Sequence, residues 1–371
     1  MLESAAETLK VSVRKYLTSE IEAGSFPGAV YAIGSSEGIL IEGALGYSVV
    51  KPARIRATID TLYDVASLTK PLMTASLVLR ASADGKVDLA SPVSRYVDEL
   101  RGTEKEAITF LDLLSHRAGF QAWYPLYTQG EGDAAYLTAI VKRPLRYKAG
   151  TRVIYSCLGF ILLKLALERV YQRSVEDLSR EVLFEPLGLP HACFNPSPER
   201  KYEIAATEWG NTNERNMVAE RGLTFSRFRN YIIWGETDDG NAYYMGGVGG
   251  NAGLFATARD VFGIARSYAR KGEGVLPAEL VAESTKNHTP GLQENRGLGW
   301  QLPASRPDGP ASMFSPSAFG HTGFTGTSVW IDPERDLIVV LLTNRLHPTT
   351  HANNMQTVRR KLHLIAVNAW E

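Results

Sequence analysis

Strand-like apolar segments lie near both ends of the 371-residue chain, and a long, mostly helical stretch separates them. Residues 29–33 and 39–45 are apolar runs joined by a polar turn at 34–38, which is the pattern of a β-hairpin. Strand signals return at 319–331 and 337–343. Because an isolated hairpin is marginally stable in water, we expect the strands from the two ends to form one antiparallel sheet.

Helices are expected on either side of this sheet in the sequence. Residues 4–23 place apolar side chains at helical spacing and end before Gly24, and residues 353–369 repeat that spacing. The sequence therefore predicts an α/β protein of the α+β type, in which an antiparallel sheet is flanked by the N- and C-terminal helices.

The length of the chain favours two lobes, since it exceeds the usual size of one domain. We expect a discontinuous sheet-and-helix lobe from residues 1–60 and 290–371. Residues 61–289 would form an inserted, mostly helical lobe with a long loop-like stretch at 209–250.

Charge composition argues against polyanionic partners. The 40 basic and 40 acidic side chains cancel and the pI is near 7.1, so no global field attracts nucleic acid or an anionic membrane. No apolar run is long enough to span a bilayer, and the first residues lack the pattern of a leader. We expect a cytoplasmic protein, or a periplasmic or secreted one if a signal peptide has been removed.

The sequence gives little support for a metal site or for a disulfide framework. Cys157 and Cys193 are too few for a disulfide scaffold and lack the paired spacing of a zinc site. His347 and His351 have a spacing seen in metal sites, but Pro348 intervenes and a surface loop is the simpler interpretation. No metal or organic cofactor is expected.

Ser67-Leu68-Thr69-Lys70 is the strongest local sign of chemistry. A serine hydroxyl is a poor nucleophile until a neighbouring base takes its proton. Residues at i and i+3 share a helix face, so the Lys70 amine can reach Ser67. Pro71 is tolerated only near a helix start, which places Ser67 at an N-terminal end, where the helix dipole favours negative charge. The motif alone is short enough to arise by chance.

Tyr155 is the second candidate, at the entrance of an apolar helix. A tyrosine is ordinarily protonated, with a pKa of about 10. Beside the Lys70 cation, and with a second cation nearby, its ionised form is favoured and the phenol becomes a base.

His321-Thr322-Gly323-Phe324 is the third element, on a strand expected to continue to Ile331. Gly323 lets a substrate backbone lie against the strand edge. An edge amide, paired with the Ser67 amide, would hold the oxyanion of a tetrahedral intermediate.

In this order, Ser-x-x-Lys, Tyr-Ser-x-x-Gly-Phe and His-Thr-Gly resemble the class C β-lactamase and penicillin-binding-protein superfamily, which includes serine esterases. The resemblance implies a β-lactamase/transpeptidase-like fold. It also implies that Ser67 is the nucleophile and that Lys70 and Tyr155 are the general base pair. Residues 321–324 would be the substrate edge, with the Ser67 and Phe324 amides as oxyanion donors. Supporting segments occur at 108–119, 246–255, 297–300 and 343–345.

Two departures from the family pattern bear on the substrate. Many relatives have Tyr-x-Asn where this chain has Cys157, and a thiol is a poor donor for gripping a substrate's amide. The Lys of Lys-Thr-Gly is His321 here, which ordinarily titrates near neutrality and would make activity vary between about pH 5 and 8. Both changes favour esters or peptides over β-lactams.

Other nucleophiles are weaker candidates. Gly34-Ser35-Ser36-Glu37-Gly38 matches an α/β-hydrolase pattern, but it lies in the predicted hairpin turn rather than at a strand-to-helix elbow. Cys157 has no evident histidine partner. His116 is expected to be a structural, hydrogen-bonded histidine.

Three functional classes follow. The first is a serine hydrolase acting through acyl-Ser67 on a small ester, β-lactam or D-peptide, with esterase-type or weak β-lactamase activity most favoured. The second is a penicillin-binding receptor or D-amino-acid peptidase with slow deacylation. The third is a silent scaffold, which the joint presence of Ser67, Lys70 and Tyr155 disfavours.

Overall fold

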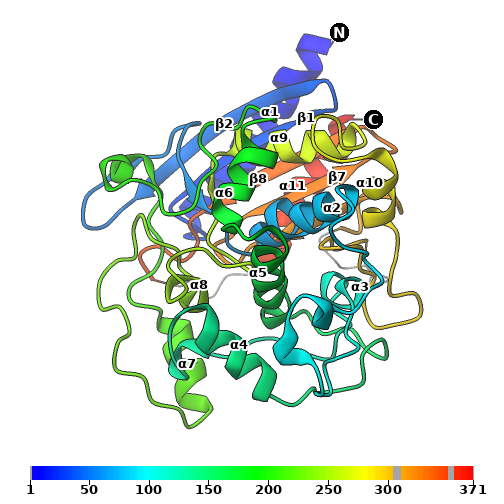
Figure 1. Ribbon diagram of the computed structural model, residues 1–371. Coiled ribbons are helices and arrows are strands. Elements are labelled where there is room, and N and C mark those ends of the chain that lie inside the picture. Colours follow the sequence, from blue (N-terminus) through cyan, green and yellow to red (C-terminus); the bar gives the residue numbers. More distant parts are fainter. Residues whose placement is uncertain (1, 304–310, 350–354, 371) are drawn as a thin grey trace.

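A six-stranded antiparallel sheet joins the two ends of the chain. The computed structural model describes residues 2–303, 311–349 and 355–370. The first strand pairs with the last one, with Ala29 opposite Thr343, so the prediction of one shared sheet is confirmed (Figure 1). In spatial order the strands are β3 (Ile55–Arg56), β2 (Gly38–Val49), β1 (Gly28–Ser35), β8 (Leu337–Thr343), β7 (Ser328–Asp332) and β6 (Phe319–Thr322).

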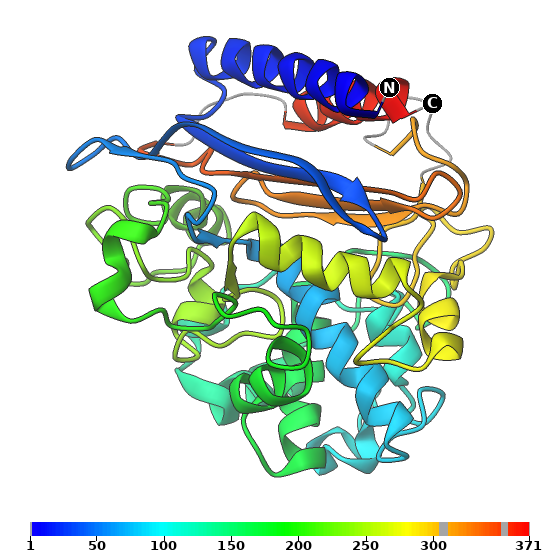
Figure 2. The same cartoon turned by 90° about the horizontal axis from the view of Figure 1, so that it is seen from above.

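The central strands are apolar throughout because both faces of the sheet are covered. On β1, Val30 and Ala32 belong to one hydrophobic core, whereas Tyr31 and Ile33 belong to a second core on the opposite face. Figure 2 shows the helices α1 (Leu2–Glu22) and α11 (Met355–Trp370) together over one face. The two predicted flanking helices are confirmed, apart from residues 353 and 354, which lie outside the described residues.

The helical part of the chain covers the other face of the sheet. Helix α9 packs directly on β1, β7 and β8, and α5 is buried from Leu158 to Leu167 within the helical part (Figure 1). These helices are α2 (Ser76–Ala83), α3 (Phe110–Leu114), α4 (Gly132–Lys142), α5 (Cys157–Tyr171), α6 (Val175–Ser179), α7 (Thr212–Glu220), α8 (Gly240–Tyr243), α9 (Ala258–Ala269) and α10 (Ala278–Thr285).

The predicted fold class is confirmed, and the lobe boundaries at residues 60 and 290 stay predictions. The stretch at 209–250 is less loop-like than expected, because it contains α7 and α8. Contacts distant in sequence hold these two helices, since the Glu214 carboxylate accepts hydrogen bonds from the Gly240 amide and the Tyr127 hydroxyl, each at 2.8 Å.

The prediction of a single strand over residues 319–331 is wrong. Strand β6 ends at Thr322, and the chain turns back into β7. The Gly323 amide donates to the Thr327 carbonyl at 2.7 Å, and Gly326 has a φ of +105° that favours glycine. Gly323 and Phe324 therefore lie in a hairpin turn between β6 and β7 rather than along a strand edge.

Candidate active site

Ser67 lies where a two-stranded ribbon turns into a helix. Strand β4 (Tyr63–Asp64) pairs with β5 (Phe255–Ala256) and is followed by a 3-10 turn, Ala66–Leu68. A wider helical turn then leads into α2. The predicted reach across one turn is confirmed, since Lys70 Nζ lies 3.1 Å from Ser67 Oγ. Ser67 is half-buried, whereas Lys70 is fully buried.

The turn before Ser67 is held by Asp64, a residue that sequence reasoning did not single out. Its carboxylate accepts hydrogen bonds from the amides of Ala66 at 2.8 Å and Asp238 at 2.7 Å. Ala66 has a φ of +49°, which is uncommon for a residue with a side chain. Burial raises the pKa of Asp64 to about 7.

Lys70 remains a cation in its buried position. Burial by itself would lower its pKa, but the facing Cys157 and Tyr155 groups raise the pKa above its ordinary value. The ammonium also donates to the Asn251 carbonyl at 2.9 Å. Lys70 therefore connects the nucleophile to the glycine-rich segment 246–253.

Tyr155 reaches the site from the residues that precede α5. Its neighbours are fixed by the backbone, because the Ser156 amide donates to His116 Nδ1 at 3.0 Å and the Cys157 amide to the Ala122 carbonyl at 2.8 Å. Lys70 Nζ lies 4.8 Å from the centre of the Tyr155 ring. The Tyr155 hydroxyl is buried and has no hydrogen bond of ordinary length within the described residues.

The proton affinity of Tyr155 reflects two opposed effects. Burial is the larger effect and raises the pKa of the Tyr155 phenol above its ordinary value, while the Lys70 charge and the polar contacts of Lys70 and Ser67 act in the opposite direction. The expected hydrogen bonding of His116 is confirmed, since its buried ring accepts the Ser156 amide, and the ring packs 4.6 Å from the Tyr155 ring.

His321 lies beside this group but does not titrate as expected. Burial, with the positive charges of Arg296 and Lys70, holds the pKa of His321 well below its usual range. Its Nδ1 lies 2.8 Å from the Thr322 carbonyl, which assigns the proton to Nδ1 and leaves Nε2 as an acceptor. The expectation of a histidine that changes charge near neutral pH is therefore wrong.

The β6–β7 turn is tied to the nucleophile segment. Thr325 Oγ1 donates to the Asp64 carbonyl at 2.8 Å, and Thr327 Oγ1 donates to the Val65 carbonyl at 3.0 Å. A Cβ on Gly323 would lie 2.0 Å from Thr327 Oγ1 and 2.6 Å from the Val65 oxygen. This close contact requires a glycine at position 323, and a substrate backbone lying against the glycine stays a prediction.

Phe324 follows in the turn and is 46% exposed. Its carbonyl accepts a hydrogen bond from Arg345 Nε at 2.7 Å. Its amide donates to no carbonyl within the described residues. Its role as an oxyanion donor, which the family resemblance implies, stays a prediction.

Ser67, Tyr155 and the residues of the β6–β7 turn line one cleft of about 550 Å³. Cys157 is not among the lining residues, and burial raises the pKa of its thiol. Three arginines in the wall were not predicted as site residues. The complete lining is Ser67, Tyr155, Glu294, Arg296, Gln301, His321, Thr322, Gly323, Phe324, Arg345, Met355, Gln356 and Arg359.

One of these arginines, Arg359, could have been recognised from the sequence. Arg359 stands four residues after Met355 and three before Leu362, on the buried stripe of α11. Its Nη2 donates to the carbonyls of Gly323 at 2.9 Å and Thr327 at 3.0 Å. A cation on an apolar helix face indicates a buried acceptor. Arg296 and Arg345 lie in segments with no such pattern.

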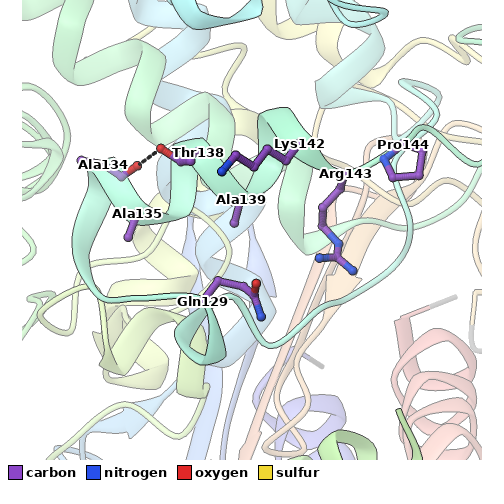
Figure 3. A pocket seen from close by; sticks show the side chains of 8 residues that line it. All are labelled: Gln129, Ala134, Ala135, Thr138, Ala139, Lys142, Arg143 and Pro144. Carbon is purple, nitrogen blue, oxygen red and sulfur yellow. Dashed lines mark hydrogen bonds between the residues drawn. The ribbon is translucent and has the colours of Figure 1, made fainter. Parts of the chain in front are cut away.

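A second hollow, of about 460 Å³, lies along α4 (Figure 3). Its lining contains neither Ser67 nor Tyr155, and its hydroxyl group, Thr138 Oγ1, donates to the Ala134 carbonyl at 2.9 Å. Arg143 in its wall lies over the Tyr124 ring. This hollow offers no activated nucleophile.

The other sequence alternatives that fall among the described residues make hydrogen bonds away from Ser67. Ser36 lies in the β1–β2 turn, where its hydroxyl donates to Asp336 at 3.0 Å. His347 Nε2 accepts the Val50 amide at 2.9 Å, and His351 lies outside the described residues. Within the described ranges no cluster of side chains suits a metal ion. No helix there has the length and apolar character needed to cross a bilayer.

The fold and the Ser67 cleft together define a serine hydrolase. The family model described as Beta-lactamase matches residues 13–363, and the chain therefore belongs to the β-lactamase family.

Relatives and solved structures agree with that assignment. A protein of Escherichia coli O157:H7 named "Putative D-alanyl-D-alanine carboxypeptidase" is 32% identical, over 90% of this chain and 81% of its own. The octameric penicillin-binding protein homologue from Pyrococcus abyssi has a TM-score of 0.74 at 18% identity, over 96% of this chain and 76% of its own. EstCE1, a hydrolase with promiscuous acyltransferase activity, has a TM-score of 0.74 at 19% identity, over 98% of this chain and 99% of its own. At these identities the two structures show the fold.

Proposed function

We propose that the protein hydrolyses small acyl substrates through an ester formed on Ser67. The observation that carries the proposal is the 3.1 Å contact between Lys70 Nζ and Ser67 Oγ, next to a buried Tyr155 hydroxyl that makes no hydrogen bond of ordinary length within the described residues. A nucleophile beside a base, here Tyr155 with the Lys70 cation to stabilise its phenolate, is the arrangement that covalent catalysis needs.

The reaction would proceed in two halves. As Ser67 Oγ attacks the acyl carbonyl, its proton passes to Tyr155, whose anionic form the Lys70 ammonium stabilises. The amides of Ser67 and Phe324 stabilise the oxyanion. Tyr155 then protonates the leaving alcohol or amine, and a water molecule releases the acyl group by the same steps in reverse.

Esterase-type activity is our first choice for the substrate. Cys157 replaces the amide that would grip a substrate's own amide group, and its thiol does not reach the cleft lining. A substrate that needs no such grip, such as a short-chain ester, depends on fewer of the missing contacts.

A D-amino-acid carboxypeptidase is the second candidate, and a separate observation favours it. Arg345 and Arg359 line the cleft near Phe324, so a substrate with a carboxylate would meet positive charge there. The names of the curated relatives in Escherichia coli point in the same direction. A penicillin-binding receptor would share these contacts but would release the acyl group slowly.

Parallel kinetics separate these candidates. We would measure kcat/KM for p-nitrophenyl butyrate, for a penicillin and for a peptide ending in D-alanyl-D-alanine. Esterase activity predicts the highest value for the ester, whereas a carboxypeptidase predicts release of D-alanine. A receptor would show one equivalent of product with penicillin and then stop. No turnover and no adduct with any of the three would contradict the proposed function.

A further inference from the structure

Arg296 places a second permanent charge beside the proposed base. Its side chain is buried, and its guanidinium carbon lies 5.4 Å from the centre of the Tyr155 ring. Two backbone contacts fix the residue, because its amide donates to Thr289 Oγ1 at 2.9 Å and its strand-like segment pairs with Gln301. Gln301 pairs in turn with Gly320 on β6. Arg296 is thereby held against the same strand that carries His321.

Four other titratable groups of the described residues lie close to Tyr155: His116, His321, Cys157 and Lys70. His116 accepts a backbone amide through Nδ1 and is uncharged, and burial holds the pKa of both His116 and His321 well below the usual range. Burial keeps the Cys157 thiol protonated by raising its pKa. Among these groups Lys70 carries a positive charge, and its ammonium donates to Ser67 Oγ at 3.1 Å and to the Asn251 carbonyl at 2.9 Å.

Burial of the phenol creates the need for a second charge. A buried phenolate is costly, and Lys70 alone must both polarise Ser67 and balance Tyr155. An arginine stays protonated throughout the working pH range, and a cation within about 6 Å of an aromatic ring is attracted to its face. The attraction is stronger when the ring bears a phenolate, by Coulomb's law.

We propose that the Arg296 guanidinium is the second positive charge that makes Tyr155 a usable base, with Glu294 as the counter-charge that moderates it. This role rests on the proposed function of Ser67 and Tyr155. Arg296 Nε donates to Glu294 at 3.0 Å, and Glu294 is half-exposed while Arg296 is buried. Arg296 acts through Tyr155 and is a positioning residue rather than a group that touches the reacting atoms.

Substitutions that remove the charge of Arg296 and the opposite charge of Glu294 test the proposal. We would measure kcat/KM for a neutral p-nitrophenyl ester over a range of pH. The fall of kcat/KM toward low pH, which we call the acid limb, reports the pKa of the free enzyme's base. Arg296→Gln removes a positive charge, so the limb should move to higher pH by about one unit. Glu294→Gln removes the counter-charge, so the limb should move to lower pH, by less. Arg296→Lys should restore most of the wild-type profile.

The same pH profiles provide the control and the results that would overturn the inference. Arg259 and Glu42 form an exposed ion pair away from the cleft, and Arg259→Gln should leave the limb in place. An unmoved limb in both Arg296→Gln and Glu294→Gln would overturn the inference, as would shifts of the same sign. If Arg296 instead binds a substrate carboxylate, Arg296→Gln would raise KM for the D-alanyl peptide and leave the neutral-ester profile unchanged, which also overturns it.

Failure of the inference and failure of the proposed function are distinguishable. If Arg296→Gln does not fold, as judged by circular dichroism, the exposed Glu294→Gln variant still decides by the direction of its shift. If the wild type forms no acyl-enzyme on Ser67, the proposed function fails. If it does form one while the limb stays in place, only the role of Arg296 fails.

Discussion

At the residue scale, the low pKa of His321 means that this side chain is not the source of the pH response of the cleft. Its neighbours Arg296 and Lys70 are cations, so a third positive charge in the same buried space is unfavourable. A neutral His321 with its proton on Nδ1 offers an acceptor at Nε2 and contributes no charge to Tyr155.

Replacing His321 therefore has different effects depending on charge. His321→Gln removes no charge and should leave the acid limb of kcat/KM where it is in the wild type. His321→Lys adds a positive charge beside Tyr155, which lowers the pKa of the phenol and should move the limb to lower pH by about one unit. A limb that moved to higher pH in His321→Gln would show that the wild-type histidine carries a charge.

At the scale of elements, the β6–β7 turn sets the distance between the two expected oxyanion donors. Gly323 packs against Val65 and Thr327, and two threonine hydroxyls bind the carbonyls just before the nucleophile turn. Arg359 on α11 holds the turn from the other side through the Gly323 and Thr327 carbonyls. The position of Phe324 thus depends on three separate elements.

Gly323→Ala tests this dependence. The added methyl group meets backbone and hydroxyl oxygen at less than 3 Å, so the turn must shift and carry the Phe324 amide with it. We expect kcat/KM to fall by roughly tenfold to a hundredfold and the free energy of unfolding by about 1–3 kcal/mol.

A matched glycine provides the control. In Gly159→Ala, within α5, the new methyl group would meet Leu113 Cδ2 at 3.5 Å, which is ordinary contact. Activity should be retained there, and helix propensity should offset any small packing cost. Equal losses in the two variants would contradict a specific role for the turn.

The sequence predicts elements well where a local pattern carries the information. The Ser67–Lys70 contact follows from spacing on one turn, and the flanking helices follow from apolar periodicity. The hairpin at 319–331 was missed because apolar and threonine residues continue through the turn, and only its glycines mark the reversal. Arg296 and Asp64 could not be predicted as site residues, because their roles arise from segments brought together by the tertiary fold.

At the scale of the whole molecule, buried acids make stability depend on pH. Asp64 is 2% exposed and its pKa is raised to about 7, whereas an unfolded aspartate has a pKa of about 3.9. Between these values the folded state binds more protons than the unfolded state. The contribution of the neutral acid is therefore full below about pH 4 and is lost as pH rises toward 7.

Asp64→Asn should flatten this dependence, because an amide resembles the protonated acid. In urea unfolding at pH 5 and at pH 8, the wild type should lose roughly 2 kcal/mol more stability on going to pH 8 than the variant does. A wild-type stability that rose over this range relative to Asp64→Asn would show that Asp64 is ionised and stabilised in the folded protein.

An acyl-enzyme on Ser67 is the central claim, and an intact-mass time course tests it most directly. The protein would be mixed with a penicillin or with p-nitrophenyl butyrate and sampled from the first seconds onward, with Ser67→Ala as the matched control. We predict an adduct of the expected acyl mass in the wild type, which decays as product is released, and no adduct in Ser67→Ala. An adduct that persists in Ser67→Ala, or ester turnover that survives that substitution, would contradict the claim.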